Sequence, residues 1–355
     1  MTPWQAAASA TMIGSMPHRD RSRVIDFVLD QLPEIPAWPQ LSVYPAEQMM
    51  AQYLEGFPGV RTVEGRTFVD TASPEFESEL YSFYEEYLEV EAGTADLRES
   101  RFRFGPETGR SFYAFLEAIQ RRGVQPKALK GQVVGPFTLL SSLKDPLDRA
   151  LLYDDRFKDI AAKHLAMKAR WQAGRLGAPG RQVILFIDEP ALAGFGSSAF
   201  ISVTADLVLE LLKEVVDAIH DSGALAGIHI CANTDWLLAF RSGVDIINLD
   251  AYNYLDKFAL YSGAFGEYIE AGGTVAWGMV PTLDRDAAAR EDAGRLADRW
   301  TESVTGLVSA QVTPGRILSQ SLFTPSCGCS GLPEELAERV LKTTRELSIL
   351  MKSRI

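Results

Sequence analysis

Short apolar runs of β type alternate with longer amphipathic stretches along most of this 355-residue chain. The clearest runs lie at residues 183–188, 226–231, 245–250 and 274–279 and are rich in β-branched residues. Short runs of this kind are typical of parallel strands that are buried on both faces. Between them, residues 204–222 carry apolar side chains at three- and four-residue spacing, as a helix packed on a sheet does. The alternation predicts an α/β fold, because parallel strands need a crossover between them.

Additional runs bring the expected number of strands to about eight, the number in a (β/α)8 or TIM barrel. These runs lie at residues 11–16, 35–42, 128–138 and 317–323. We therefore predict a single TIM-barrel catalytic domain over residues 1–355, with a doubly wound open sheet as the alternative, because counting strands does not show closure. Residues 44–122 are too many for one crossover. We expect them to form an insertion after the second strand, folded over the barrel mouth.

The composition of the chain excludes some classes of binding partner. A net charge of −12 argues against nucleic acid and anionic membranes, which both require clustered Lys and Arg. The first 16 residues lack the basic start and apolar core of a signal peptide, and no apolar run reaches the ~18 residues of a membrane span. Three cysteines do not make a disulfide framework. We expect a soluble cytoplasmic protein.

A metal site is expected at the carboxyl ends of the strands, where a TIM barrel carries its active site. His229 and Cys231 are two residues apart on an expected strand, so their side chains point to the same side. Cys327 follows the last strand and can reach them across the mouth. One imidazole and two thiolates suit Zn²⁺. The alternative for the first pair is a buried, hydrogen-bonded histidine beside an inert cysteine.

Two further residues could complete this site. Cys329 lies two positions after Cys327, so it either joins the metal ligands or stands aside. Asp250 ends another expected strand and could supply a fourth, oxygen ligand, or could instead cap the following helix.

Two acidic residues, Asp188 and Glu189, end an apolar strand directly before Pro190. Acids held at such a position favour a role in substrate binding over an ordinary loop start. Asp188 has no basic residue next to it in the sequence, so its carboxylate suits the amino group of a substrate. We predict Asp188 as the catalytic residue and both acids as substrate-binding residues.

Several short motifs, in the same order along nearly the whole chain, resemble the catalytic barrel of cobalamin-independent methionine synthase, within the uroporphyrinogen decarboxylase and methionine synthase superfamily. The matching segments are Met12-Ile13-Gly14-Ser15-Met16-Pro17, Lys130-Gly131, Gly135-Pro136-Phe137-Thr138, Phe186-Ile187-Asp188-Glu189-Pro190-Ala191-Leu192, Ile228-His229-Ile230-Cys231, Asp245-Ile246-Ile247-Asn248-Leu249-Asp250 and Pro325-Ser326-Cys327-Gly328.

The resemblance implies a barrel in which His229, Cys231 and Cys327 bind Zn²⁺ and the turn of Ile13, Gly14 and Ser15 binds an amino acid together with Asp188. It also implies a zinc-dependent methyltransferase for a homocysteine-like thiol. A thiol is mostly protonated at neutral pH, and binding to Zn²⁺ converts it into a thiolate that can accept a methyl group.

Three departures from the family bear on the methyl donor. The family's fourth ligand is a glutamate where this chain has Asp250, and the histidine expected after the seventh strand is Val280 here. No second, folate-binding barrel precedes this one in the 355 residues. Together they favour a methyl-corrinoid or corrinoid protein over a methyltetrahydropterin as donor, because cob(I)alamin leaves without a proton from a general acid.

Two other functions remain open from the sequence. One is a decarboxylase like uroporphyrinogen decarboxylase, which needs no metal. The other is a non-catalytic accessory protein that binds a corrinoid or zinc, an alternative kept open by Val280.

Overall fold

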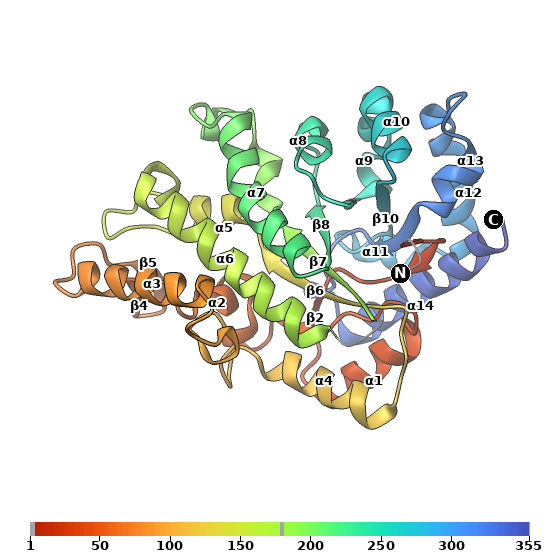
Figure 1. Cartoon of the computed structure of the whole chain (residues 1–355). Coiled ribbons are helices and arrows are strands. Elements are labelled where there is room, and N and C mark those ends of the chain that lie inside the picture. The colour runs from red at the N-terminus through yellow and green to blue at the C-terminus, as the bar shows by residue number, and fades with distance from the viewer. Residues whose placement is uncertain (1–3, 178–180, 355) are drawn as a thin grey trace.

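The computed structural model describes residues 4–177 and 181–354 (Figure 1). At its centre lies a seven-stranded sheet in the order β1-β11-β10-β9-β8-β7-β6, in which every pair is parallel. Its strands are β1 (Ser9–Ala10), β6 (Ala128–Val134), β7 (Gln182–Asp188), β8 (Leu225–Ile230), β9 (Ile246–Leu249), β10 (Thr274–Val280) and β11 (Ser321–Pro325). From β6 to β11 each strand pairs with the next in sequence, without the reversal of order that marks a doubly wound sheet.

Backbone hydrogen bonds continue past the two edges of this sheet. Lys130 in β6 donates from its amide to the Pro36 carbonyl at 3.0 Å and accepts from the Trp38 amide at 3.4 Å. A few residues later, β3 (Gln40–Leu41) pairs in parallel with β2 (Ser15–Met16). These bonds lead from β6 back toward the first strand, so the sheet curls round into a TIM-like barrel. The predicted barrel class is confirmed in this form.

Helices cover the outside of the sheet, as Figure 1 shows for α6 and α7, which lie side by side. The helices after β6 are α5 (Pro136–Ser142), α6 (Asp155–Leu176), α7 (Ala205–Asp221), α8 (Trp236–Arg241), α9 (Ala251–Phe258), α10 (Ser262–Glu270), α11 (Arg285–Arg290), α12 (Ala293–Ser303), α13 (Pro314–Ser319) and α14 (Glu334–Lys352). Short 3-10 helices are η1 (Pro45–Glu47), η2 (Leu97–Glu99), η3 (Leu151–Tyr153), η4 (Pro190–Gly194), η5 (Ser198–Phe200), η6 (Ala259–Tyr261) and η7 (Val304–Leu307).

The amphipathic helix expected at residues 204–222 is α7. The side chain of Thr204 accepts from the Leu207 amide at 3.2 Å and so caps the first turn. The buried face of α7 includes Val208, Leu212 and Val215 and follows the three- and four-residue spacing seen in the sequence.

The barrel has two apolar clusters, one outside the ring of strands and one inside it. The larger cluster lies between the strands and the surrounding helices. The smaller one fills the barrel interior with side chains from facing strands, namely Ala6, Ile35, Ala128, Ile184, Phe186, Ile246, Ala276 and Leu322. Interior layers of this kind make a TIM barrel a packed core and not a pore, so ligands have access at its ends.

Of the runs expected at residues 11–16 and 35–42, only β2 and β3 are strands, and two other predicted strands extend too far. The strand expected at residues 128–138 ends at Val134, because Pro136 takes the first position of α5, where its fixed φ angle suits a helix. The strand expected at residues 317–323 begins only at Ser321, since residues up to Ser319 complete α13. In both places an apolar run continues across a change of secondary structure.

Residues 44–122 fold into α2 (Met49–Leu54), a hairpin of β4 (Val60–Val63) and β5 (Arg66–Val69), α3 (Phe76–Glu91) and α4 (Arg110–Arg122). Tyr84 in α3 donates to Asp159 of α6 at 2.8 Å, and Phe83 lies against the His164 ring of α6 at 6.2 Å. Helix α4 packs on α1 (Arg21–Gln31). These contacts run along the outer helices, and the position of the segment over the barrel mouth stays a prediction.

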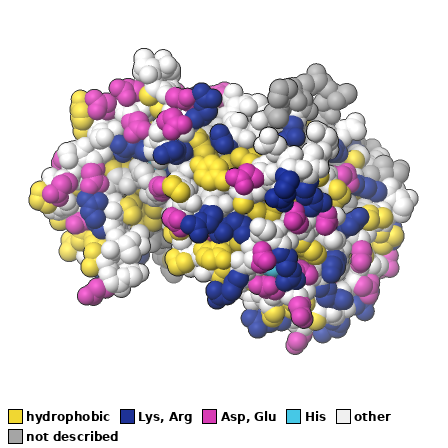
Figure 2. Space-filling model, turned by 90° about the horizontal axis from the view of Figure 1, so that it is seen from below, with side chains coloured by type: hydrophobic (Ala, Val, Ile, Leu, Met, Phe, Trp, Pro, Cys, Tyr) yellow, Lys and Arg dark blue, Asp and Glu magenta, His cyan; other side chains and the backbone are white. Residues whose placement is uncertain are grey.

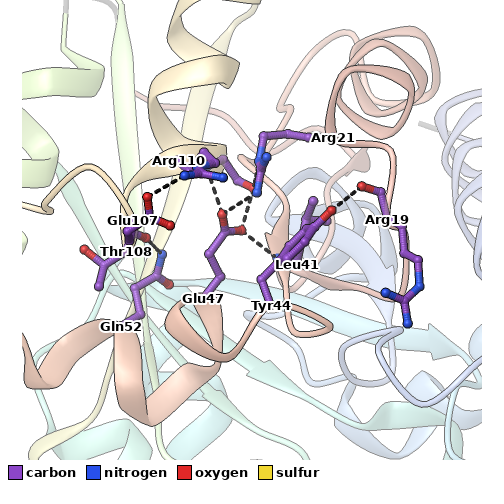
Figure 3. A network of polar contacts seen from close by, with 10 residues as sticks. Arg19, Arg21, Leu41, Tyr44, Glu47, Gln52, Glu107, Thr108 and Arg110 are labelled. Atoms are coloured by element: carbon purple, nitrogen blue, oxygen red, sulfur yellow. Dashed lines mark hydrogen bonds and ion pairs between the residues drawn. The ribbon is translucent and has the colours of Figure 1, made fainter.

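A buried carboxylate ties this segment to the barrel (Figure 3). Glu47 is 1% exposed and pairs with Arg21 of α1 at 2.8 Å. It also accepts from the Leu41 amide of β3 at 3.3 Å and from the Ser111 amide of α4 at 3.2 Å. One side chain thus joins α1, β3 and α4.

The surface gives no sign of a single strongly basic face in the view of Figure 2, where Lys and Arg lie among acidic and apolar side chains. Within the described ranges, none of the helices combines the length and the apolar character needed to cross a membrane.

Candidate metal and ligand site

The ends of β8 and β11 bring together the three residues expected to hold a metal. His229 lies on β8, Cys231 follows that strand directly, and Cys327 comes two residues after β11. One potential ligand atom from each residue lies within 4.8 Å of the other two. The histidine is buried and both cysteines are half-buried, so the cluster reaches solvent from the thiol side.

Asn248 of β9 fixes the orientation of the His229 ring. The Asn248 amide donates to the Ala276 carbonyl at 2.7 Å and to the Thr324 hydroxyl at 2.9 Å. Its Oδ1 atom therefore faces His229 Nδ1, and this contact requires a proton on Nδ1. In the neutral ring, the other nitrogen, Nε2, then carries a free lone pair. It is buried and has no hydrogen-bond partner in the described parts of the chain.

The Cys231 and Cys327 thiols lie side by side and shift each other's pKa in opposite directions. The pKa of Cys231 is lowered to about 4, chiefly because the Cys327 thiol lies beside it as a hydrogen-bond donor, with His229 adding to the effect against burial. The pKa of Cys327 is raised for the same first reason. A thiolate next to a free imidazole nitrogen is the donor set that Zn²⁺ prefers. His229, Cys231 and Cys327 therefore fit a zinc ion.

The two candidates for a fourth ligand lie outside this three-residue cluster. Asp250 caps α9: its carboxylate accepts from the Asn253 amide at 3.0 Å and from the Asn253 side chain at 2.7 Å. Cys329 is 2% exposed and belongs to the apolar core, where burial raises its pKa to about 12. The structure therefore gives Asp250 a capping role and leaves Cys329 as a buried thiol.

Asp188 ends β7 in register with His229 on the neighbouring strand. Its Oδ1 atom is buried and accepts no hydrogen bond from any residue that the structure describes. Burial raises the pKa of Asp188 to about 6, against the opposing effects of His229 and Lys130. An unsatisfied carboxylate oxygen next to the metal cluster suits a cationic group of a ligand.

Glu189 has a different task. Its carboxylate accepts from the Phe137 amide at 2.9 Å, the Thr138 amide at 2.8 Å and the Thr138 hydroxyl at 2.6 Å. The side chain is fully buried, and its oxygens are occupied by donors from the first turn of α5. In the structure Glu189 holds α5 against the end of β7, and its predicted contact with a substrate stays a prediction.

The turn of Ile13, Gly14 and Ser15 lies against the loop that carries Cys327. The Ser15 carbonyl accepts from the Cys329 amide at 2.9 Å. A Cβ atom at Gly328 would lie 1.9 Å from Ser15 Oγ and 3.2 Å from Ser15 Cβ, so a larger residue there must displace the Ser15 side chain or shift the loop. The turn and the metal cluster are thus neighbours, and amino-acid binding by the turn stays a prediction.

Lys130 is a site residue that sequence reasoning missed. It lies on β6, is fully buried, and donates from Nζ to the Ile13 carbonyl at 2.6 Å. Its ammonium group lies 4.2 Å from the centroid of the Phe186 ring. Burial lowers its pKa to about 8, against the attraction of Asp188. The available signal was a lysine inside an otherwise apolar strand, because buried lysines are rare unless they are paired.

No family model and no curated protein matches this chain. Several solved structures do. One is that of the tandem GH20 catalytic modules of the pneumococcal exo-β-D-N-acetylglucosaminidase StrH, with 9% identity over 96% of this chain and 85% of that chain and a TM-score of 0.48. Another is GH5_18 from Streptomyces cattleya in complex with GlcNAc, with 12% identity over 99% and 82% and a TM-score of 0.48. A third is the catalytic domain of the Bacillus sp. JAMB-750 GH26 endo-β-1,4-mannanase, with 12% identity over 70% and 71% and a TM-score of 0.42.

These comparisons correct the function predicted from the sequence. The zinc-dependent methyltransferase and its place in methionine biosynthesis were implied by a family resemblance, whereas the solved structures named above are glycoside hydrolases. The prediction of a methyltransferase is therefore withdrawn. At TM-scores of 0.48 and 0.42, the likeness gives this chain no glycosidase activity in its place.

The carboxylates at the strand ends also differ from those of most glycosidases, which place two Asp or Glu side chains on either side of the bond to be cleaved. The Glu189 oxygens are occupied by donors from the first turn of α5, and the Asp250 oxygens by Asn253 of α9. Of the three acids at the ends of β7 and β9, Asp188 is the one with a buried oxygen that accepts no hydrogen bond from the described residues.

Proposed function

We propose that the mouth of this barrel is a zinc site that binds a small amino thiol, and that the chain is an enzyme acting on that ligand. His229, Cys231 and Cys327 hold the metal, and Asp188 holds the ligand's amino group. The Ile13–Ser15 turn forms the wall of the site next to Cys327.

The observation that carries this proposal is the free Nε2 atom of His229. A buried ring nitrogen without a partner is costly. Among the described histidines His18, His164 and His229 each have one, and His229 is the one that lies in the cluster of potential metal ligands. Here the nitrogen is turned toward two thiols by the hydrogen bond from Nδ1 to Asn248. The same arrangement, with the second nitrogen held by an outer partner, is usual for histidines that bind zinc.

Three protein ligands leave one position for an exogenous group in a tetrahedral site. When bound in such a site, Zn²⁺ lowers the pKa of a thiol or water in its fourth position. The residues themselves favour a thiol with an amino group. Two thiolates balance the charge of the metal, so a third thiolate adds one negative charge. Asp188 adds another, and Lys130 offsets one of the two. An ammonium group on the ligand restores neutrality.

The proposal is tested with Co²⁺, which replaces Zn²⁺ and gives visible and near-ultraviolet bands that report its ligands. Homocysteine serves as the probe, homoserine as the analogue in which a hydroxyl replaces the thiol, and 4-mercaptobutyrate as the analogue without the amino group. We expect homocysteine to raise the thiolate-to-cobalt absorption and homoserine to leave it unchanged. 4-Mercaptobutyrate should give the same band at higher concentration. A protein that does not bind Co²⁺, or a spectrum that homocysteine does not change, contradicts the proposal.

A further inference from the structure

Lys130 is a charged side chain in the interior of the barrel. Its ammonium group is fully buried, lies close to the face of Phe186, and donates to the Ile13 carbonyl at 2.6 Å. Taking an ammonium group out of water costs several kcal/mol even after relaxation, so a lysine is rarely kept in such a place for packing alone. Its hydrogen bond goes to the backbone between β1 and β2.

The backbone that follows Ile13 contacts the loop that carries Cys327. Ile13 is followed by Gly14, whose φ of +154° is a conformation that other residues rarely adopt. Ser15 comes next, and its carbonyl accepts from the Cys329 amide at 2.9 Å. Gly328 packs against the Ser15 side chain with no room for a Cβ atom. The loop from residue 326 to residue 329, which carries Cys327, is therefore built on the turn that Lys130 holds.

We infer that Lys130 is a positioning residue of the metal site: by holding the Ile13 carbonyl, it fixes the turn that supports Cys327. The inference rests on the proposed zinc site and concerns a residue that does not itself bind the metal. It predicts that loss of the Lys130 contact weakens metal binding without removing any ligand.

The test compares Lys130→Met with Lys168→Met. Lys168 is a matched control, because it is also fully buried, donates to a backbone carbonyl (that of Arg103, at 3.3 Å) and lies 5.4 Å from an aromatic ring centroid, that of Phe104. It belongs to α6, outside the barrel interior. Zinc affinity is measured by competition with a chromophoric chelator, and the Co²⁺ spectrum of each variant is recorded.

Lys130→Met should bind zinc about 10- to 100-fold more weakly than the wild type, the range usual for outer partners of metal ligands. Its Co²⁺ spectrum should also shift. Lys168→Met should keep the wild-type affinity and spectrum, whatever it loses in thermal stability. Wild-type zinc affinity in Lys130→Met overturns the inference, and so does an equal loss in Lys168→Met. If the wild type binds no zinc, the proposed function itself fails.

A second variant tests the contact between the turn and the loop that carries Cys327. It also decides whether the inference holds if Lys130→Met does not fold. Gly328→Ala places a Cβ atom 1.9 Å from Ser15 Oγ and 3.2 Å from Ser15 Cβ, so the Ser15 side chain must rotate or the loop must shift, and either change disturbs the packing of the loop on the turn. It should lower zinc affinity to a similar degree. Ser15→Gly combined with Gly328→Ala removes the clash and should recover most of the affinity. Wild-type affinity in Gly328→Ala shows that the turn does not position Cys327.

Discussion

Replacing Asn248 separates metal binding from stability more sharply than any other change in the barrel. Asn248→Leu keeps the size of the side chain and removes its hydrogen bonds. His229 then loses the acceptor that holds its Nδ1 proton, and the Ala276 carbonyl and Thr324 hydroxyl lose their donor. Asn248→Asp keeps an acceptor for His229 and removes only the donors. The two variants therefore differ in the acceptor that the imidazole meets and in the buried carboxylate that Asn248→Asp brings next to the Ala276 carbonyl.

The expected magnitudes follow from these contacts. In both variants the Ala276 carbonyl and Thr324 hydroxyl lose the Asn248 donor, at about 1–3 kcal/mol for each buried group left unsatisfied. Both should therefore lose about 2–6 kcal/mol of the free energy of unfolding, a large part of the roughly 5–15 kcal/mol typical of a native protein. Zinc affinity should fall about 10- to 100-fold in Asn248→Leu, because the ring is no longer oriented. It should stay near the wild-type value in Asn248→Asp.

Urea denaturation of the chelated proteins gives the stabilities, and chelator competition gives the zinc affinities. If Asn248→Leu binds zinc as tightly as the wild type does, the argument that Asn248 directs Nε2 toward the metal is refuted. If both variants lose zinc equally, the loss comes from general destabilisation and not from the orientation of His229.

Three further changes test other parts of the site. Asp188→Asn should weaken homocysteine binding by about 1.5–3 kcal/mol, the usual value for a lost charged hydrogen bond, with unchanged zinc content in metal analysis. Asp250→Ala should lower the free energy of unfolding by about 0.5–2 kcal/mol through the lost cap of α9 and leave zinc binding intact, whereas loss of zinc makes Asp250 a ligand after all. Gly278→Ala brings a Cβ atom within 2.4 Å of a backbone oxygen of β9 and should cost about 1–3 kcal/mol in thermal unfolding, whereas Gly315→Ala meets nothing within 4 Å and serves as the control.

The barrel could be predicted from the sequence because its strands β7 to β10 are short, apolar and β-branched, and because helices of clear periodicity separate them. The strands that join the two edges of the seven-stranded sheet were harder to predict. Residues near 11–16 and 35–42 form only the two-residue strands β2 and β3 and scattered backbone bonds, so their pattern is weak. Residues 44–122 carry no motif that reveals which neighbours they pack against, since this depends on contacts such as that of Glu47.

In the site, the predicted grouping of His229, Cys231 and Cys327 follows from strand alternation and strand order alone, so it could be found without coordinates. The roles of Glu189 and Lys130 could not. Glu189 looks like a free acid in the sequence, and only the approach of the Phe137 and Thr138 amides shows that its oxygens are occupied. The partner of Lys130, a backbone carbonyl 117 residues away, leaves no mark on the sequence.

The central claim is tested most directly by the zinc content of the protein purified without chelator. The account predicts about one equivalent per chain, the stoichiometry of a single tetrahedral site. Cys231→Ser and Cys327→Ser should each abolish it, whereas Cys329→Ala, which changes the buried thiol outside the cluster, should retain it. Full zinc content in both serine variants, or no zinc in the wild type after growth with the metal, contradicts the account.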